Sequence, residues 1–155
     1  MDYNFSYKHF SELSTTELYK ILKLRQDVFI VEQNCIYADL DDVDLNCFHL
    51  MMIKNSELIG YSRIIAPGIK YTSSSIGRVI IKPGFRGNKL AYSLMKESIN
   101  CCNIDWKNFG ISISAQFHLM NFYFSLGFIQ HGEVYDEDGI PHIKMVLEIS
   151  EKLYL

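Results

Sequence analysis

The stretch RVIIKPGFRGNKLAYSLM, residues 78–95, most restricts the folds open to this chain. An apolar run rich in β-branched residues ends at Pro83 and Gly84, and an apolar stripe at helical spacing follows Arg86. A strand that leads through a tight turn into a helix is a building unit of α/β proteins. We therefore expect an α/β (α+β) domain, with a sheet flanked by helices.

The turn in this stretch has the composition of an anion-binding site. The first turn of a helix has about four backbone N–H groups without intrahelical partners, and the helix dipole adds roughly half a positive charge there. Gly87 lets a ligand approach the backbone closely. Arg86 and Lys89 oppose the dipole, and this unfavourable placement is explained if an anion binds between them. The alternative is an ordinary solvated connection.

The rest of the chain alternates predicted strands with predicted helices and contains no repeat or linker, so we expect residues 1–155 to form a single domain. Helices are predicted from a capping box at 14–17 to about Phe29, from Arg86 to about Cys102, and over 117–126. Seven strands are predicted, over residues 4–10, 48–53, 58–66, 75–82, 110–115, 128–135 and 140–149. Their order indicates a sheet whose first half is mostly antiparallel.

Composition excludes several classes of protein. The net charge of −3 argues against a nucleic-acid binder. No apolar run of about 18 residues predicts a membrane span, and the first ten residues lack the pattern of a signal peptide. The four cysteines form no CxxC, so we expect neither a zinc site nor disulfides, and a cytoplasmic location.

Some polar residues have simpler structural interpretations. His49 and His118 are expected to be structural, and His131 with His142 is too small a set for a metal site. A group of four aspartates is expected to form a solvated loop, or alternatively to attract a cationic acceptor; it comprises Asp39, Asp41, Asp42 and Asp44.

Motifs across the chain resemble one enzyme family. Neither the Walker pattern nor GxGxxG is present. Residues 86–91 (RGNKLA) resemble the acyl-coenzyme A loop [RQ]xxGx[GA] of the GNAT acetyltransferases, with Lys89 at the middle glycine. Residues 115–128, which end in FYFSLGF, resemble the second GNAT signature. With residues 25–33, 77–79 and 135–142, the chain resembles the ElaA-like branch, whose members tolerate Lys at that loop position.

The resemblance implies a GNAT fold, with a central mixed, mostly antiparallel seven-stranded sheet. It implies an N-acetyltransferase that moves an acetyl group from acetyl-CoA, as co-substrate, to a primary amine of a small molecule or peptide. No metal, nucleic-acid or membrane partner is implied, and a homodimer is compatible with it. The residues that the resemblance assigns to coenzyme binding are Val79, Ile80, Ile81, Arg86, Gly87, Asn88, Lys89, Leu90, Ala91 and Asn121.

Two residues are candidates for proton transfer. Tyr123 matches the family tyrosine that protonates the leaving thiolate, although residues 122–124 (FYF) would also suit an aromatic core. His142 is the candidate general base, because it lies on the less apolar face of the last strand and histidine changes charge near neutral pH. The alternative for His142 is a solvated or hydrogen-bonded structural histidine.

Two further residues are candidates for the acceptor site. Glu32 is the rival base, at the end of the first helix, where the family builds its acceptor site. Arg78 lies in an apolar strand and must bind either a carboxylate of the acceptor or a buried aspartate. The alternative to an enzyme is a non-catalytic module that binds acyl-CoA as a sensor or assembly element.

Overall fold

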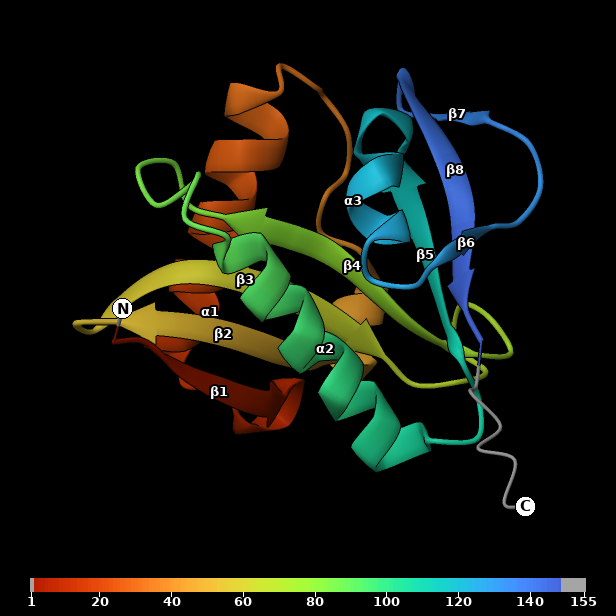
Figure 1. Cartoon of the computed structure of the whole chain (residues 1–155). Coiled ribbons are helices and arrows are strands. Elements are labelled where there is room, and N and C mark those ends of the chain that lie inside the picture. The colour runs from red at the N-terminus through yellow and green to blue at the C-terminus, as the bar shows by residue number, and fades with distance from the viewer. Residues whose placement is uncertain (1, 149–155) are drawn as a thin grey trace.

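In the computed structural model, which describes residues 2–148, the chain forms one open sheet flanked by helices (Figure 1). The sheet has eight strands in the order β1-β2-β3-β4-β5-β8-β6, with β7 paired to β8. Among the described strands, only β4 and β5 run parallel. The strands are β1 Asn4–His9, β2 Phe48–Lys54, β3 Glu57–Ile65, β4 Ser74–Ile81, β5 Ile111–Gln116, β6 Ile129–Gln130, β7 Tyr135–Glu137 and β8 Ile140–Leu147.

Three α-helices and four short helical segments connect these strands. The predicted capping box is confirmed: the Ser14 side chain accepts from Glu17 N–H and the Glu17 side chain accepts from Ser14 N–H. The α-helices are α1 Thr15–Arg25, α2 Leu90–Trp106 and α3 Met120–Phe124. The shorter segments are the 3₁₀ turns η1 Phe10–Glu12, η3 Asp42–Asn46 and η4 Phe117–Leu119, and the π-helix η2 Gln26–Glu32.

The two faces of the sheet are covered by different helices, α2 on one and α1 on the other (Figure 1). Successive side chains of a strand point to opposite faces, so Leu50 and Met52 pack in the larger core with α2, while Met51 packs against α1. Each helix therefore buries one apolar stripe, and the sheet is apolar on both faces.

Strands β4 and β5 diverge after a short region of pairing. Only Ser74–Ile111 and Ser75–Ser112 are paired, and beyond them the two strands separate, as Figure 1 shows. Helix α2 connects the strands as the crossover that a parallel pair requires. The divergence opens the middle of the sheet, at the end of β4 that leads into α2.

Three details differ from the sequence predictions. The expected strand over 128–135 is two short strands, β6 and β7, separated at Gly132, whose φ is +93°, so the sheet has eight strands rather than seven. The first helix continues as a π-helix after Arg25. The last strand ends at Leu147, and residue 149, at the end of the predicted strand, lies outside the described residues.

Candidate active site

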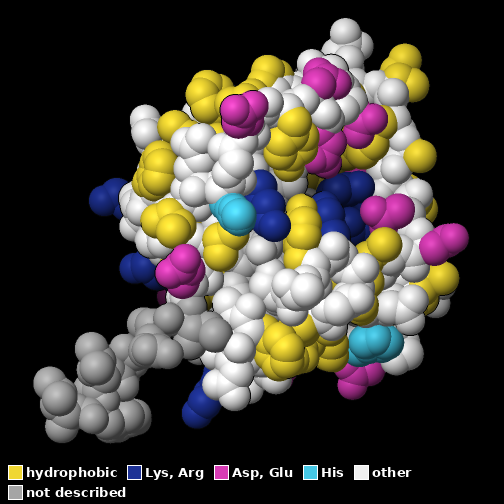
Figure 2. All heavy atoms as spheres, turned by 90° about the vertical axis from the view of Figure 1, so that its right-hand side faces the viewer, with side chains coloured by type: hydrophobic (Ala, Val, Ile, Leu, Met, Phe, Trp, Pro, Cys, Tyr) yellow, Lys and Arg dark blue, Asp and Glu magenta, His cyan; other side chains and the backbone are white. Residues whose placement is uncertain are grey.

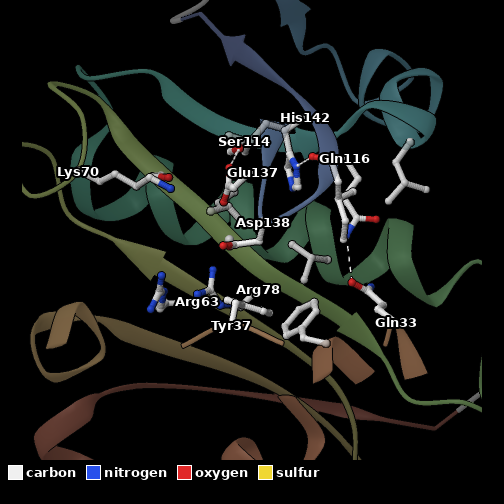
Figure 3. A pocket seen from close by; sticks show the side chains of 18 of the residues that line it. Gln33, Tyr37, Arg63, Lys70, Arg78, Ser114, Gln116, Glu137, Asp138 and His142 are labelled. Carbon is white, nitrogen blue, oxygen red and sulfur yellow. Dashed lines mark hydrogen bonds between the residues drawn. The ribbon is translucent and has the colours of Figure 1, made fainter. Parts of the chain in front are cut away.

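A cavity of about 150 Å³ lies where β4 and β5 diverge (Figure 3). Its walls come from β4, β5, α3, the end of η2 with the segment after it, and the β7–β8 hairpin. Two contacts join the segment after η2 to the opposite wall. Gln116 Nε2 donates to Gln33 Oε1 at 3.3 Å, and Cys35 Sγ donates to the Asp138 carbonyl at 3.3 Å.

A bulge in β4 forms part of the cavity wall. Tyr61 is paired with Ile80 and Arg63 with Gly77, so two residues of β4 face a single residue of β3. Arg78 is one of these two and has φ +53°, the left-handed conformation that costs a non-glycine residue about 1–2 kcal/mol. A bulge removes its extra residue from the ladder, so it makes backbone N–H groups of this segment available to a ligand.

Arg78 is fixed in this position by an aspartate and two aromatic rings. Its Nε donates to Asp39 Oδ1 at 2.6 Å, and its guanidinium lies 6.0 and 5.7 Å from the ring centres of Phe29 and Tyr37. Of the two partners proposed for Arg78, the structure supplies the buried aspartate. Its charge is therefore already balanced within the protein.

Arg78 belongs to a larger ion network, which corrects the expectation of a solvated aspartate loop. Arg25, itself fully buried, pairs with Asp39 and Asp44, both at 2.8 Å. Asp39 and Asp44 are only 4% and 7% exposed. Arg63 donates to Asp41 at 2.5 Å and to Asp44 at 2.8 Å. Three arginines from α1, β3 and β4 thus bury most of the cluster, and its charge is not free to attract an acceptor.

The network and its neighbour His49 couple the fold to pH. Burial is the largest influence on the pKa of Asp44 and by itself raises it, but hydrogen bonds and charges from Arg25 and Arg63 lower that pKa below its usual value. Burial lowers the pKa of His49, whose ring contacts the Tyr61 hydroxyl at 2.8 Å and the Asp44 carbonyl at 3.2 Å. His49 is thus structural, as predicted.

We expect stability to fall in two stages on acidification. Above about pH 6.5 His49 is neutral whether folded or unfolded; below it the unfolded chain takes up the proton more readily, so stability falls. The stability that ionised Asp44 gives the folded state is fully present above about pH 4. It is lost as the pH falls through the pKa of Asp44 in the folded protein, which lies below the usual value. The denaturant midpoint, measured from pH 8 to pH 3, should show both declines.

Matched variants separate the two stages. His49→Gln should remove the first decline, and Asp42→Asn, an exposed carboxylate of the same η3 segment, should leave both unchanged. A midpoint that stays constant from pH 7 to pH 4.5 would contradict the assignment to His49.

Tyr123 lies at the boundary between the aromatic core and the cavity. Its ring packs edge-to-face against Phe122 and Phe128, at centroid distances of 5.0 and 6.0 Å, and the residue also lines the cavity. Its hydroxyl has no hydrogen-bond partner among residues 2–148. Burial raises the pKa of Tyr123 to about 12, so the hydroxyl stays protonated near neutral pH and has a proton to donate.

His142 lines the same cavity, with a defined tautomer. Its Nδ1 lies 2.8 Å from the Ile140 carbonyl oxygen, which can only accept, so we assign the proton of the neutral ring to Nδ1. Nε2 then carries a lone pair, and no described residue binds it. The side chain is 8% exposed, and the Tyr135 ring stacks against it at 6.2 Å. Figure 3 shows the ring in the cavity wall. This arrangement suits a proton acceptor.

The loop between β4 and α2, residues 82–89, leaves space for an anion at the helix N-terminus. Gly84 and Gly87 have φ of +92° and +84°, and no neighbouring atom lies within 4 Å of the position that a Cβ would take on either. Lys89, the residue before α2, has φ +57°, a conformation that glycine adopts more readily. Lysine therefore adds backbone strain at this position, which glycine would relieve.

Arg86 and Glu32 form an ion pair outside the cavity. Arg86 Nη1 and Nη2 donate to the two carboxylate oxygens of Glu32, at 2.7 and 3.1 Å, and Nε donates to the Ile81 carbonyl. Glu32 is not among the residues that line the cavity. Glu32 thus lies outside the cavity that Tyr123 and His142 line, and it contacts the loop between β4 and α2.

The other predicted site residues lie in four different surroundings. Val79 lines the cavity, whereas Ile80, Ile81 and Leu90 are buried in the core and Ala91 packs against it. Asn88 donates to the Phe85 and Arg86 carbonyls within its own loop. Asn121 is exposed on α3, away from the cavity wall.

Several residues in or near the cavity were not predicted from the sequence, among them Ser114, Tyr135 and Glu137. Ser114 donates to Glu137 Oε2 at 2.6 Å and also contacts the Tyr135 hydroxyl. Tyr135 and Glu137 could have been predicted from the hairpin turn at residues 138–139. Pairing across that turn places Tyr135 opposite the candidate base His142 and Glu137 opposite Ile140. Ser114 gives no comparable signal, since β4 and β5 contain three other serines, Ser74, Ser75 and Ser112.

Within residues 2–148, no group of three or more histidine, cysteine or acidic side chains is arranged to hold a metal ion. No helix in that part of the chain is long and apolar enough to cross a membrane. The four cysteines are unpaired, three of them buried.

Comparisons with known proteins identify the family. The family model described as "Acetyltransferase (GNAT) domain" matches residues 20–149. Protein ElaA of Escherichia coli K12 is 46% identical over 145 residues, which are 92% of this chain and 95% of ElaA. The crystal structure of ElaA aligns with TM-score 0.89 at 43% identity, over 95% of this chain and 100% of that one. An acyl-CoA N-acyltransferase from Pseudomonas aeruginosa aligns with TM-score 0.91 at 36% identity, over the same shares.

Proposed function

This chain belongs to the GNAT acetyltransferase family and is an acyltransferase that takes its acyl group from acyl-CoA, and we propose that it transfers acetyl from acetyl-CoA to a primary amine of a small molecule or peptide. The observation that carries the proposal is the cavity between β4 and β5. It is lined by a neutral phenol, Tyr123, by a lone pair on His142 and by the β4 bulge. These are the groups that amide formation from a thioester requires.

Coenzyme binding is assigned to the loop and to the bulged strand. The phosphates of acetyl-CoA would bind the backbone N–H groups of residues 86–91 at the start of α2, as at other helix N-termini. Backbone N–H groups near Val79 would polarise the carbonyl of the acyl group. When bound, the coenzyme supplies an activated acyl group as a thioester. A cavity of about 150 Å³ that must also admit the amine favours a short acyl group such as acetyl.

His142 is proposed as the base because the amine arrives mostly protonated. An amine with a pKa near 10 is neutral about once in a thousand at pH 7, a shortfall of about 4 kcal/mol. Nε2 of His142 has no protein partner among the described residues and lines the cavity, so it can accept that proton. Nδ1–H remains bound to the Ile140 carbonyl, which supports the imidazolium once it forms.

Tyr123 is proposed to protonate the leaving thiolate. Its pKa of about 12 exceeds the usual thiol value near 8.5, so this transfer is uphill if each group is taken alone. A thiolate in the same buried cavity is desolvated as well, which raises the pKa of its thiol and narrows the difference. Proton transfer can then accompany departure of the sulfur.

Arg78 and Glu32 receive more limited roles. Arg78 is proposed to shape the acceptor wall and to donate hydrogen bonds, since Asp39 already balances its charge. Glu32 is proposed to orient Arg86 and so to act through coenzyme affinity. A cytoplasmic location and a homodimer remain predictions.

Thiol release tests the activity. The protein should release free coenzyme A from acetyl-CoA only when a suitable amine is present, and faster than from an acyl-CoA with a long chain. A mass-spectrometric screen of a metabolite extract with labelled acetyl-CoA should identify the acceptor. Binding of acetyl-CoA without transfer to any amine or peptide would instead indicate a non-catalytic acyl-CoA-binding module.

The pH profile tests His142. Wild-type kcat/KM should rise with pH, because the base must be neutral to accept a proton. His142→Gln should remove that rise and lower the rate by about 10²-fold, the usual scale for a general base. Alkali should partly restore the variant, since more amine then arrives neutral.

Glu32→Gln is the matched control. It should raise KM for acetyl-CoA through Arg86 and keep the rise with pH. If the rise persists in the His142 variant and disappears in the Glu32 variant, Glu32 is the base.

A further inference from the structure

We propose that the acceptor is a linear diamine or polyamine, whose second ammonium group binds Glu137 and Asp138 of the β7–β8 hairpin. This inference rests on the proposed function, because it names the amine that the same cavity receives. It goes beyond that function in requiring two cationic groups on one acceptor.

The hairpin places these carboxylates beside the proposed base. Tyr135 pairs with His142 and Glu137 with Ile140, and the two pairs are two residues apart along the hairpin. Side chains of opposite partners, and of residues two apart, point to the same face of a sheet. Glu137, Ile140 and His142 accordingly line one cavity, and Figure 3 shows Glu137 and Asp138 beside it.

The carboxylates of the hairpin form no ion pair among the described residues, although the Lys70 ammonium is near enough to interact electrostatically with Glu137. Glu137 is half-buried and accepts a hydrogen bond from Ser114 at 2.6 Å, but it forms no ion pair with the described residues. Asp138 is exposed at the turn, where its backbone carbonyl accepts from Cys35. A half-buried carboxylate that faces a cavity is most stable when a cation enters that cavity.

The opposite wall is basic but already largely balanced. In Figure 2, Lys and Arg side chains gather in a hollow on this face, with Asp and Glu side chains around it. Arg63 and Arg78 line the cavity, yet both are paired within the aspartate network. Lys70 is the one lining cation without an ion pair among residues 2–148. Its ammonium lies 5.4 Å from the centre of the Tyr71 ring.

His142 is the independent observation that points to an amine ligand. It is more than nine-tenths buried, it lines the cavity, and its Nε2 has no partner among the described residues. A lone pair there suits the ammonium that must lose its proton. The cross-strand pair Tyr135–His142 and the pair Glu137–Ile140 are two residues apart along the hairpin, which is roughly 7 Å. This is about the length of a diamine with four or five methylene groups. One ammonium would then meet His142 while the other meets Glu137.

Acceptors of equal chain length test the proposal. We would compare 1,5-diaminopentane, pentylamine and 5-aminopentanoic acid, which share an aminobutyl chain and end in a protonated aminomethyl, a methyl or a carboxylate group. The diamine should have a kcat/KM about 10-fold or more above that of pentylamine, with the amino acid lowest. Glu137→Gln should remove most of the advantage of the diamine over pentylamine, and Asp138→Asn a smaller part, because Asp138 is exposed.

The controls separate this binding role from others. Glu133→Gln, an exposed carboxylate outside the cavity, should leave the preference unchanged. Lys70→Met should strengthen the preference by removing a competing cation. If the amino acid equals or exceeds the diamine, or if Glu137→Gln lowers both amines equally, the proposal is wrong and the basic wall selects the acceptor.

Binding measurements separate failure of this proposal from failure of the proposed function. Calorimetry with 1,5-diaminopentane and coenzyme A should detect binding that Glu137→Gln weakens. Such binding without acetyl transfer would support the acidic site and overturn the enzymatic function. Acetylation of pentylamine without any preference for the diamine would overturn the acidic site and leave the enzymatic function intact.

Discussion

Tyr123→Phe should bind acetyl-CoA nearly as well as the wild type, and its turnover should be lower by about 10²-fold or more, the usual scale for loss of a general acid. The substitution removes one hydroxyl and keeps the ring that packs against Phe122 and Phe128, so the core should remain intact. Without the proton the sulfur must leave as a thiolate from a buried site. Calorimetric binding of acetyl-CoA and steady-state kcat, measured on the same preparation, give the two quantities.

Tyr3→Phe is the control for loss of a tyrosine hydroxyl. Its ring packs against Phe5, at 5.6 Å, on the border of the same core, and the residue does not line the cavity. Its kcat should match the wild type. A Tyr123→Phe enzyme with wild-type kcat would remove Tyr123 from the mechanism.

Gly87→Glu should abolish binding of acetyl-CoA, by 10³-fold or more in affinity. The space that a Cβ would take at Gly87 is open, so the Cβ of the new side chain meets no neighbouring protein atom. It would instead place a carboxylate against the proposed pyrophosphate position. The rise in melting temperature that acetyl-CoA should give the wild type would then be absent.

Gly132→Glu is the control for the backbone strain that Gly87→Glu introduces. Gly132 also has φ +93° with open space at its Cβ position, but it lies between β6 and β7, remote in sequence from the coenzyme loop. Both substitutions should therefore lose similar stability, about 1–2 kcal/mol for a left-handed residue. Only Gly87→Glu should lose binding. If that variant folds and binds with unchanged affinity, the phosphates lie elsewhere.

Local signals predicted the parts of the fold that depend on neighbouring residues. The capping box at Ser14 and Glu17 fixed the start of α1, and the glycine-bearing turn marked the start of α2. Tyr123 and His142, predicted from a family resemblance and from strand alternation, line one cavity although nineteen positions separate them. The family comparison, the fold class and the acyltransferase assignment are confirmed.

Contacts between distant residues could not be predicted in this way. Asp39 pairs with Arg25 and Arg78, fourteen and thirty-nine positions away, so nothing in the spacing of the aspartates reveals their burial. Likewise Glu32 and Arg86 are fifty-four positions apart. Each such pair depends on the tertiary fold, in which buried charges must find partners.

The most direct test of the account follows a labelled acetyl group from acetyl-CoA. With 1,5-diaminopentane, or with an amine identified in the screen, mass spectrometry should find the label on the amine nitrogen. One equivalent of free coenzyme A should form for each acetylated amine. Label that is released only as acetate, or that stays on the coenzyme while acetyl-CoA binds, would contradict the proposal that this cavity catalyses acetyl transfer to an amine.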